Sequence, residues 1–245
     1  MIVLGFDTAT SATAVGLRLA DASTLERRDD PREGEHPGHA TRLLPFAAEL
    51  LARAGLEWDA IDRIAVGTGP GRFTGLRVGV ATARGLAQSL RAELVGVSSL
   101  RALAHGAAPE YPDRPLLAVI DARRGEVFTA AYAAGAQDRG HEIDFGPPLR
   151  PAELAAAVSR ADDLGGPGRG VVAVGDGAVR YRAELEEHGA MVPQDADPAH
   201  LIGTHAICAL GLSAPVHGAR DVVPDYRRDA DAAIARAARA PAGRV

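Results

Sequence analysis

Lysine is absent from this 245-residue sequence, so all 27 basic residues are arginine. Without lysine the chain cannot form a lysine-dependent phosphate loop or a Schiff base, and it has no lysine general base. The net charge of −5 argues against nucleic-acid binding through bulk positive charge. We therefore expect any contact with RNA to be local or shared with a partner.

Cysteine and long apolar runs are also scarce. Cys208 is the single cysteine, so no internal disulfide can form, and we expect a protein of the reducing cytoplasm. No run reaches about 18 apolar residues and no charged-then-apolar leader follows Met1, so we expect neither a membrane span nor a targeting segment. Apolar residues make up 47% of the chain, enough for one large or two small domains.

Two segments about a hundred residues apart share one pattern, an apolar strand that ends in an aspartate and returns after a turn. Residues 2–19 follow this pattern around Asp7 and its hydroxyl-rich turn. Residues 115–132 repeat it around Asp121. The repetition predicts a duplicated α/β fold, because each apolar run is of the kind common in strands buried on both faces.

Nucleotide-binding folds of the actin, sugar-kinase and Hsp70 class use such a unit to hold a phosphate. Backbone N–H groups of the turn contact the phosphate while the aspartate addresses a metal. That class usually has glycine two residues after the aspartate. Ala9 stands at this position here, and its Cβ should hinder close approach of a phosphate.

Residues 63–90 contain an apolar strand, a glycine-rich turn and a helix. Larger apolar side chains recur at steps of four and three from Leu76 to Leu90, which predicts an amphipathic helix. Gly75 and Gly79 lie on a largely distinct face of this helix, and each costs about 1 kcal/mol relative to alanine. Two such glycines allow another helix to approach closely. The sequence leaves open whether that helix belongs to the same domain or to another protein.

Two further segments are candidates for function. Residues 39–54 are predicted to form a helix that stops at Gly55. His36 and His39 flank its start, and without further ligands this pair does not indicate a metal site. Residues 175–177 form a strand–Gly-x-Gly–helix junction, which occurs both at ligand sites and in ordinary tight turns; both interpretations stay open.

These motifs resemble those of the TsaB (YeaZ) family, the non-catalytic partner in bacterial N6-threonylcarbamoyladenosine synthesis on tRNA. The resemblance is carried by residues 7–10, 39, 42–45, 69–79, 96–100, 121–127 and 224–228. It implies an α/β, actin-like ATPase-domain (ASKHA) fold in two duplicated halves, each with a mixed sheet flanked by helices. We expect one half at residues 1–106, joined by the returning segment 213–245, and the other at residues 107–212.

The resemblance implies a chain without a catalytic site that pairs with a TsaD-like transferase subunit. A TsaE-like ATPase completes the assembly, tRNA is reached only through it, and no membrane is involved. The catalytic relative binds metal through an H-x-x-x-H pair, whereas this chain has Ser99 and Leu103 at those positions. A hydroxyl and an isobutyl group cannot replace two imidazoles, which argues against a metal site and against a metalloprotease.

Several alternatives remain at this level. No cofactor is expected to bind tightly, and the sequence leaves open whether ATP or ADP with Mg²⁺ binds at the partner interface. It also leaves open whether the chain forms a homodimer when the partner is absent. The alternative function is an ATP-dependent kinase or hydrolase of the same fold, in which Asp7 and Asp121 would be the metal-addressing carboxylates.

The site predictions fall into two groups, and no residue is expected to be catalytic or to bind metal. The predicted partner-interface residues are His39, Arg42, Leu43, Leu50, Phe73, Thr74, Gly75, Leu76, Gly79, Val80 and Ala83. The predicted nucleotide-contact residues are Asp7, Thr8, Ser11, Asp121, Arg123, Gly175 and Gly177.

Overall fold

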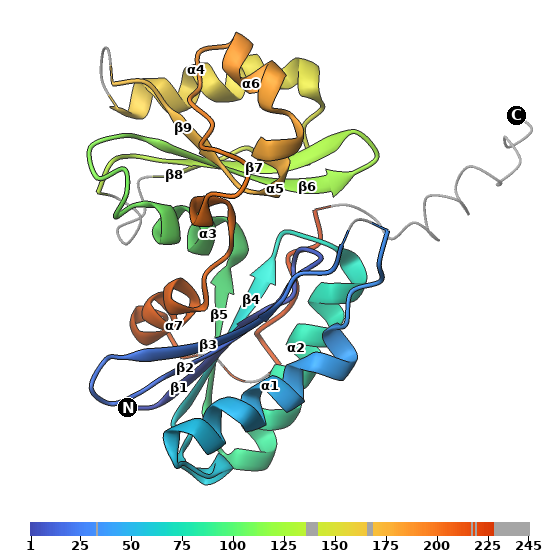
Figure 1. Cartoon of the computed structure of the whole chain (residues 1–245), viewed down its shortest axis with the longest axis vertical. Helices are drawn as coiled ribbons and strands as arrows, with labels where there is room; N and C mark the ends of the chain where they lie inside the picture. The colour runs from blue at the N-terminus through green and yellow to red at the C-terminus, as the bar shows by residue number, and fades with distance from the viewer. Residues whose placement is uncertain (33, 136–141, 166–168, 217, 219, 228–245) are drawn as a thin grey trace, which may run out of the picture.

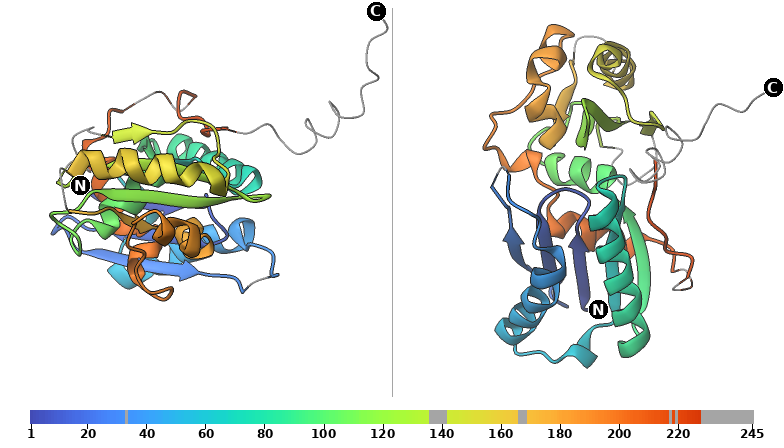
Figure 2. Two further views of the ribbon diagram at one scale, coloured as in Figure 1. Left: turned by 90° about the horizontal axis from the view of Figure 1, so that it is seen from above. Right: turned by 90° about the vertical axis from the view of Figure 1, so that its right-hand side faces the viewer.

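The computed structural model describes residues 1–32, 34–135, 142–165, 169–216, 218 and 220–227, and these residues form two α/β halves stacked along the long axis (Figure 1). The halves are seen from two further sides in Figure 2. In the described residues, no helix has both the length and the apolar character that crossing a membrane requires.

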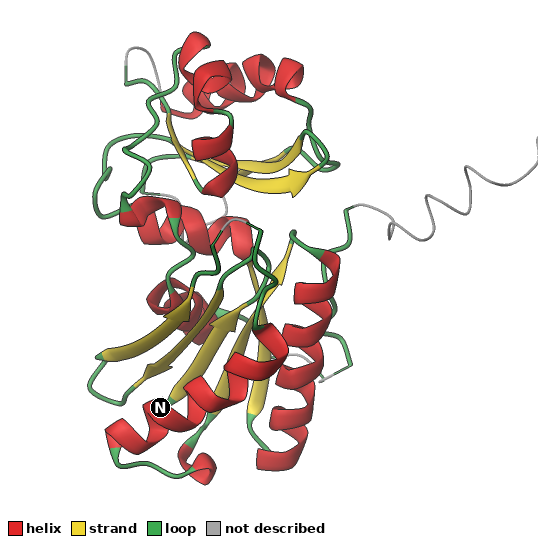
Figure 3. Ribbon diagram, turned by 45° about the vertical axis from the view of Figure 1, so that its right-hand side comes forward, coloured by secondary structure: helices red, strands yellow, loops and turns green. Residues whose placement is uncertain are grey.

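The first half is built on a five-stranded sheet. Its strands are β1 (Val3–Asp7), β2 (Thr13–Arg18), β3 (Thr24–Asp29), β4 (Arg63–Gly69) and β5 (Glu93–Ser98), in the order β3-β2-β1-β4-β5. β1 pairs antiparallel with β2 and parallel with β4. Two helices, α1 (His39–Ala54) and α2 (Phe73–Leu90), cover one face of the sheet (Figure 3), and a short 3-10 helix (Trp58–Ala60) precedes β4.

The second half is built on a four-stranded sheet. Its strands are β6 (Leu116–Arg123), β7 (Glu126–Tyr132), β8 (Glu142–Asp144) and β9 (Val172–Val174), in the order β8-β7-β6-β9. The helices α4 (Leu154–Gly165), α5 (Asp176–Arg180) and α6 (Arg182–Glu187) pack on its outer face, where they share one apolar cluster with Leu117 and Val119 of β6.

The two sheets repeat one topology, because in each the order runs third, second, first and fourth strand. In each, the first strand pairs antiparallel with the second and parallel with the fourth. The prediction of an α/β fold in two duplicated halves, each with a mixed sheet flanked by helices, is confirmed.

Between the sheets lie α3 (Ser99–Ala107) and α7 (Thr204–Ser213), which follows a 3-10 helix (Pro198–His200). One apolar cluster joins these helices to the facing sides of β1, β4, β5 and β6. α7 lies so close to the first sheet that a Cβ added at Gly5 would be 2.5 Å from Cys208 Sγ. The predicted boundary at residue 212 assigns α7 to the second half, whereas its side chains pack on the first sheet.

Candidate functional site

Asp7 lies at the end of β1 and is held by groups of its own half. It is only 2% exposed, and its Oδ1 accepts a hydrogen bond from the Ala9 N–H at 2.7 Å. Ser99 Oγ donates to Asp7 Oδ2 at 2.6 Å and accepts from the Gly69 N–H at 3.2 Å. Burial raises the pKa of Asp7, and the Ser99 and Ala9 donors offset part of that rise.

Asp121 occupies the equivalent position at β6. Its Oδ1 accepts from the Arg123 N–H at 2.9 Å, two residues further on, as Asp7 accepts from Ala9. The Asp121 N–H donates to Asp176 Oδ1 at 2.9 Å, and Arg180 Nη1 lies 3.6 Å from Asp121 Oδ2. The internal duplication therefore extends to the hydrogen bonds of the two turns.

Charged groups from both halves face each other near Asp121. Asp176 reaches solvent, yet the surrounding protein removes enough hydration to raise its pKa to about 6, and the charge of Asp121 acts in the same direction. Burial and the charge of Arg123 lower the pKa of Arg72 on the first half, while Asp176 and Asp121 oppose that shift. Opposite charges contributed by the two halves therefore lie near one another at this position.

The glycine face of α2 packs against the β1–β2 turn of the same half. A Cβ added at Gly75 would overlap the Thr8 carbonyl oxygen, and one added at Gly79 would overlap Thr8 Oγ1. That hydroxyl donates to the Gly75 carbonyl at 2.8 Å. Gly71 is held against Ala9 in the same way, and the Arg72 N–H donates to the Ala9 carbonyl at 2.7 Å.

This packing corrects the assignment of Gly75 and Gly79 to a partner interface. The element that approaches them is a turn of the same domain, because the glycines leave room for Thr8. Asp7 and Thr8, which were predicted to contact nucleotide, are both buried and hydrogen-bonded within the chain, and their contact with nucleotide stays a prediction.

The remaining nucleotide-contact predictions divide in two. Gly175 and Gly177 are buried against β6, where a Cβ added at Gly175 would overlap the Val119 carbonyl oxygen and one added at Gly177 would lie 2.9 Å from Val119 Cγ1, so this junction is tightly packed. Ser11 is half-buried and Arg123 is exposed. Arg123 adopts φ +63°, a left-handed conformation that costs a non-glycine residue about 1–2 kcal/mol.

Most of the predicted partner-interface residues are also corrected, because they form the core between the helices and their own sheet. Leu43, Leu50, Leu76, Val80 and Ala83 are at most 2% exposed. His39 is buried too, with its Nδ1 hydrogen-bonded to Thr13 Oγ1 at 2.8 Å. Only Arg42, Phe73 and Thr74 of the predicted set reach solvent. An amphipathic stripe marks the face that a helix buries, and here that face covers the sheet.

The opposite faces of the same two helices carry exposed apolar residues, most of which are small. We call this surface the outer helix face. On α1 these residues are Leu44, Pro45, Ala48 and Ala52, and on α2 they are Ala81 and Gly85. Leu44 is 45% exposed, and a Cβ added at Gly85 meets nothing within 4 Å. A signal for this face was present in the sequence, because residues 44, 48 and 52, like residues 81 and 85, are spaced by four.

Two motifs that lie about 150 residues apart in the chain meet at the start of α2. The Tyr226 ring lies 5.1 Å from the Phe73 ring, and Arg77 Nε donates to the Tyr226 hydroxyl at 3.1 Å. Arg227 donates both Nη groups to the Asp144 carboxylate of β8, one of them at 2.7 Å. Residues 220–227, here called the C-terminal strap, thereby link the two halves; Arg228 of that motif lies outside the described residues.

Ser99 and Leu103, which the sequence resemblance places at the metal-binding histidines of the catalytic relative, are both buried in α3. Within the part of the chain that the structure describes, no three histidine, cysteine, aspartate or glutamate side chains are placed to hold a metal ion together. The arrangement around Asp7 is a closed hydrogen-bond network rather than an open coordination site.

Comparison with known proteins agrees with this geometry. Residues 33–145 match the family model described as "TsaD: tRNA N6-adenosine threonylcarbamoyltransferase". The TsaB protein of Escherichia coli is 39% identical over 132 residues, covering 54% of this chain and 55% of that protein. The crystal structure of YeaZ from Pseudomonas aeruginosa has a TM-score of 0.71 at 28% identity and covers 91% of this chain and 100% of its own. The chain belongs to the TsaB (YeaZ) family.

The extent of these matches is uneven. An uncharacterized protein of Mycobacterium tuberculosis is 38% identical over 156 residues, which is 60% of this chain and 69% of that protein. The chain spans about half the length of the curated TsaB relatives it matches, 55% for Escherichia coli and 52% for Haemophilus influenzae.

Proposed function

We propose that this chain is a non-catalytic subunit in tRNA N6-threonylcarbamoyladenosine synthesis, where it stabilises and positions a TsaD-like transferase subunit. A TsaE-like ATPase completes the assembly, and tRNA is reached through it. Family membership supports the pathway. The observation that carries the non-catalytic role is the burial of the β1–β2 turn, because this turn is where a kinase of this fold would hold phosphate.

The buried turn weighs against the ATP-dependent kinase or hydrolase. α2 fills the space over Thr8 and Ala9, and Ser99 occupies one oxygen of Asp7. In the second half, Asp176 already accepts the Asp121 N–H. We expect the isolated chain to bind ATP with Mg²⁺ no tighter than ~0.1 mM, about 5 kcal/mol. Titration calorimetry measures this, and a sub-micromolar constant together with turnover that Asp7→Ala abolishes would establish the kinase instead.

The partner surface in this proposal is the outer helix face. Its small side chains allow a facing helix to approach closely, and the exposed Leu44 supplies an apolar anchor. This assignment keeps α1 and α2 as the partner-binding helices, as the sequence predicted. It replaces the buried interface residues of that prediction with the exposed residues on the opposite side of each helix. The homodimer of the isolated chain would use the same face.

A charge placed on this face tests the proposal. Ala81→Arg puts an unpaired guanidinium group into the contact, and burying it should weaken binding of the TsaD-like subunit by at least tenfold, about 1.4 kcal/mol. Ala183→Arg makes the same change at an exposed alanine on α6 of the second half and should bind normally. Analytical sedimentation measures the affinity of each variant for the TsaD-like subunit, and calorimetry measures the melting of the same preparations. Equal affinities for the two variants would remove the outer helix face from the interface.

A further inference from the structure

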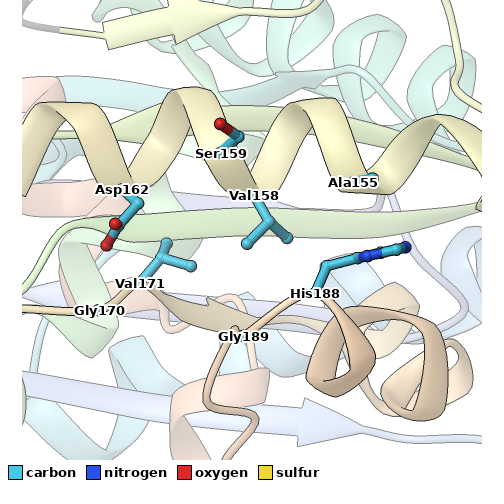
Figure 4. Close-up of a pocket in the computed structure, with 8 residues that line it drawn as sticks. All are labelled: Ala155, Val158, Ser159, Asp162, Gly170, Val171, His188 and Gly189. Atoms are coloured by element: carbon cyan, nitrogen blue, oxygen red, sulfur yellow. The ribbon is translucent and has the colours of Figure 1, made fainter.

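The second half contains a cavity that lies away from the outer helix face. It has a volume of about 480 Å³ and opens between α4 and the segment that follows α6. Figure 4 shows Asp162 at one end and His188 at the other, with Val158 and Val171 between them. Gly170 and Gly189 line the remaining wall without side chains, so backbone borders the cavity there.

The Asp162 carboxylate is the unusual group of this cavity. Its side chain points from α4 towards the segment that carries Val171 (Figure 4), and its Oδ1 is shielded from solvent. Among the described residues, none donates a hydrogen bond to that oxygen. A buried acceptor without a partner is costly, more so for a charged group, so a site that keeps one needs an explanation.

Nearby arginines do not supply the missing donor. Arg114 lies beside Gly170 but donates to the Gly170 carbonyl at 3.1 Å and to Met191 Sδ at 3.1 Å. Arg169 donates to the Asp113 carbonyl at 3.2 Å. Arg160 of α4 stacks over the Phe145 ring at 5.0 Å. None of these guanidinium groups makes a hydrogen bond to Asp162 Oδ1.

We infer that this cavity binds a small organic cation, an ammonium or guanidinium group on a short alkyl chain. The Asp162 carboxylate turns so that Oδ1 faces the cavity and accepts the charged N–H donors, and Val158 and Val171 contact the alkyl chain. The His188 side chain lies at the end of the cavity opposite Asp162 (Figure 4), so in this proposal it limits the length of the alkyl chain. The volume falls in the range of small-molecule pockets, roughly 300–1,000 Å³.

The test uses the full chain with n-butylamine, and n-butanol as the uncharged control of the same length. Amide NMR shifts are followed during titration. We expect saturable binding of n-butylamine with shifts centred on α4, and none of n-butanol. Asp162→Asn keeps the shape and removes the charge, so it should weaken the amine at least tenfold. Asp163→Asn makes the same change at the exposed neighbouring residue and should bind as the natural chain does.

A third variant separates the cavity from the charge. Ala155 is half-buried at the cavity rim, so Ala155→Phe fills the space while the apolar core under α4 stays intact. It should abolish amine binding without lowering the thermal midpoint. Absence of saturable amine binding, equal binding of n-butanol, or unchanged binding in Asp162→Asn would each overturn the inference.

Discussion

The contact between α2 and the β1–β2 turn predicts an unusual effect of alanine at Gly75. In a helix interior, alanine normally stabilises relative to glycine by about 1 kcal/mol. Here the new Cβ would fall inside 3.0 Å of the Thr8 carbonyl oxygen, a separation that real Cβ atoms do not adopt, and 3.1 Å from His39 Nε2. The turn or the helix must therefore move.

The expected magnitude follows from three contributions. Overpacking of this kind costs about 1–3 kcal/mol, and disturbing the 2.8 Å hydrogen bond from Thr8 Oγ1 to Gly75 adds about 1 kcal/mol. The gain in helix propensity returns about 1 kcal/mol. We expect Gly75→Ala to lose about 2 kcal/mol of unfolding free energy, which lowers the melting midpoint by about 4–8 °C in a chain of this size.

Gly85 supplies the matched control, because it lies in the same helix at an open, exposed position. Gly85→Ala should raise the unfolding free energy by about 0.5–1 kcal/mol. Gly79→Ala should fall between the two, since its neighbour is the movable Thr8 hydroxyl. Calorimetric melting of all three variants measures the order. If Gly75→Ala melts as high as Gly85→Ala, the turn does not pack on α2 and the reasoning about the occluded phosphate site fails.

Three further predictions concern charged groups. Ser99→Ala removes a donor from the buried Asp7 carboxylate and should lower the free energy of unfolding, measured in urea at pH 7, by about 1–3 kcal/mol. This loss should shrink as acid protonates Asp7, and a loss that does not change with pH would contradict the prediction. Because the pKa of Asp176 is raised to about 6, the folded chain binds a proton that the unfolded chain lacks between about pH 4 and 6. Stability from this group should therefore fall as the pH rises through that window, and Asp176→Asn should flatten urea-unfolding profiles there; identical profiles would refute the shift. Arg227→Ala frees the C-terminal strap from Asp144 and should speed chymotrypsin cleavage at Tyr226, while unchanged digestion would show that the strap is held elsewhere.

Sequence reasoning was most successful where local pattern and burial coincide. Both apolar strands were predicted, because strands covered on both faces give continuous apolar runs whatever packs on them. The first ends at Asp7 as predicted, whereas the second runs past Asp121 to Arg123. The first helix ends as predicted at Gly55, which adopts φ +66° and closes the last turn. Both features depend only on residues that are neighbours in the sequence.

The site was harder to predict because it depends on residues far apart in the chain. The spacing of Gly75 and Gly79 indicates that something approaches closely, but not what, and the approaching Thr8 is 67 residues away. The apolar stripe of α2 was assigned to a partner although it forms the core, since periodicity alone does not say what covers a face. The contact of Tyr226 with Phe73 leaves no local signal at all.

The position of α7 has a consequence for synthesis on the ribosome. β1, β4 and β5 are complete once residue 98 has been made, yet the helix that covers their inner face ends at residue 213. One face of the first sheet therefore stays without α7 while the ribosome synthesises the whole second half. Domains usually fold in order from the N-terminus, but here the later half can close before the earlier one is finished. A fragment that stops before α7 should aggregate, because the inner face of the first sheet stays exposed. A fragment that includes α7 can cover this face.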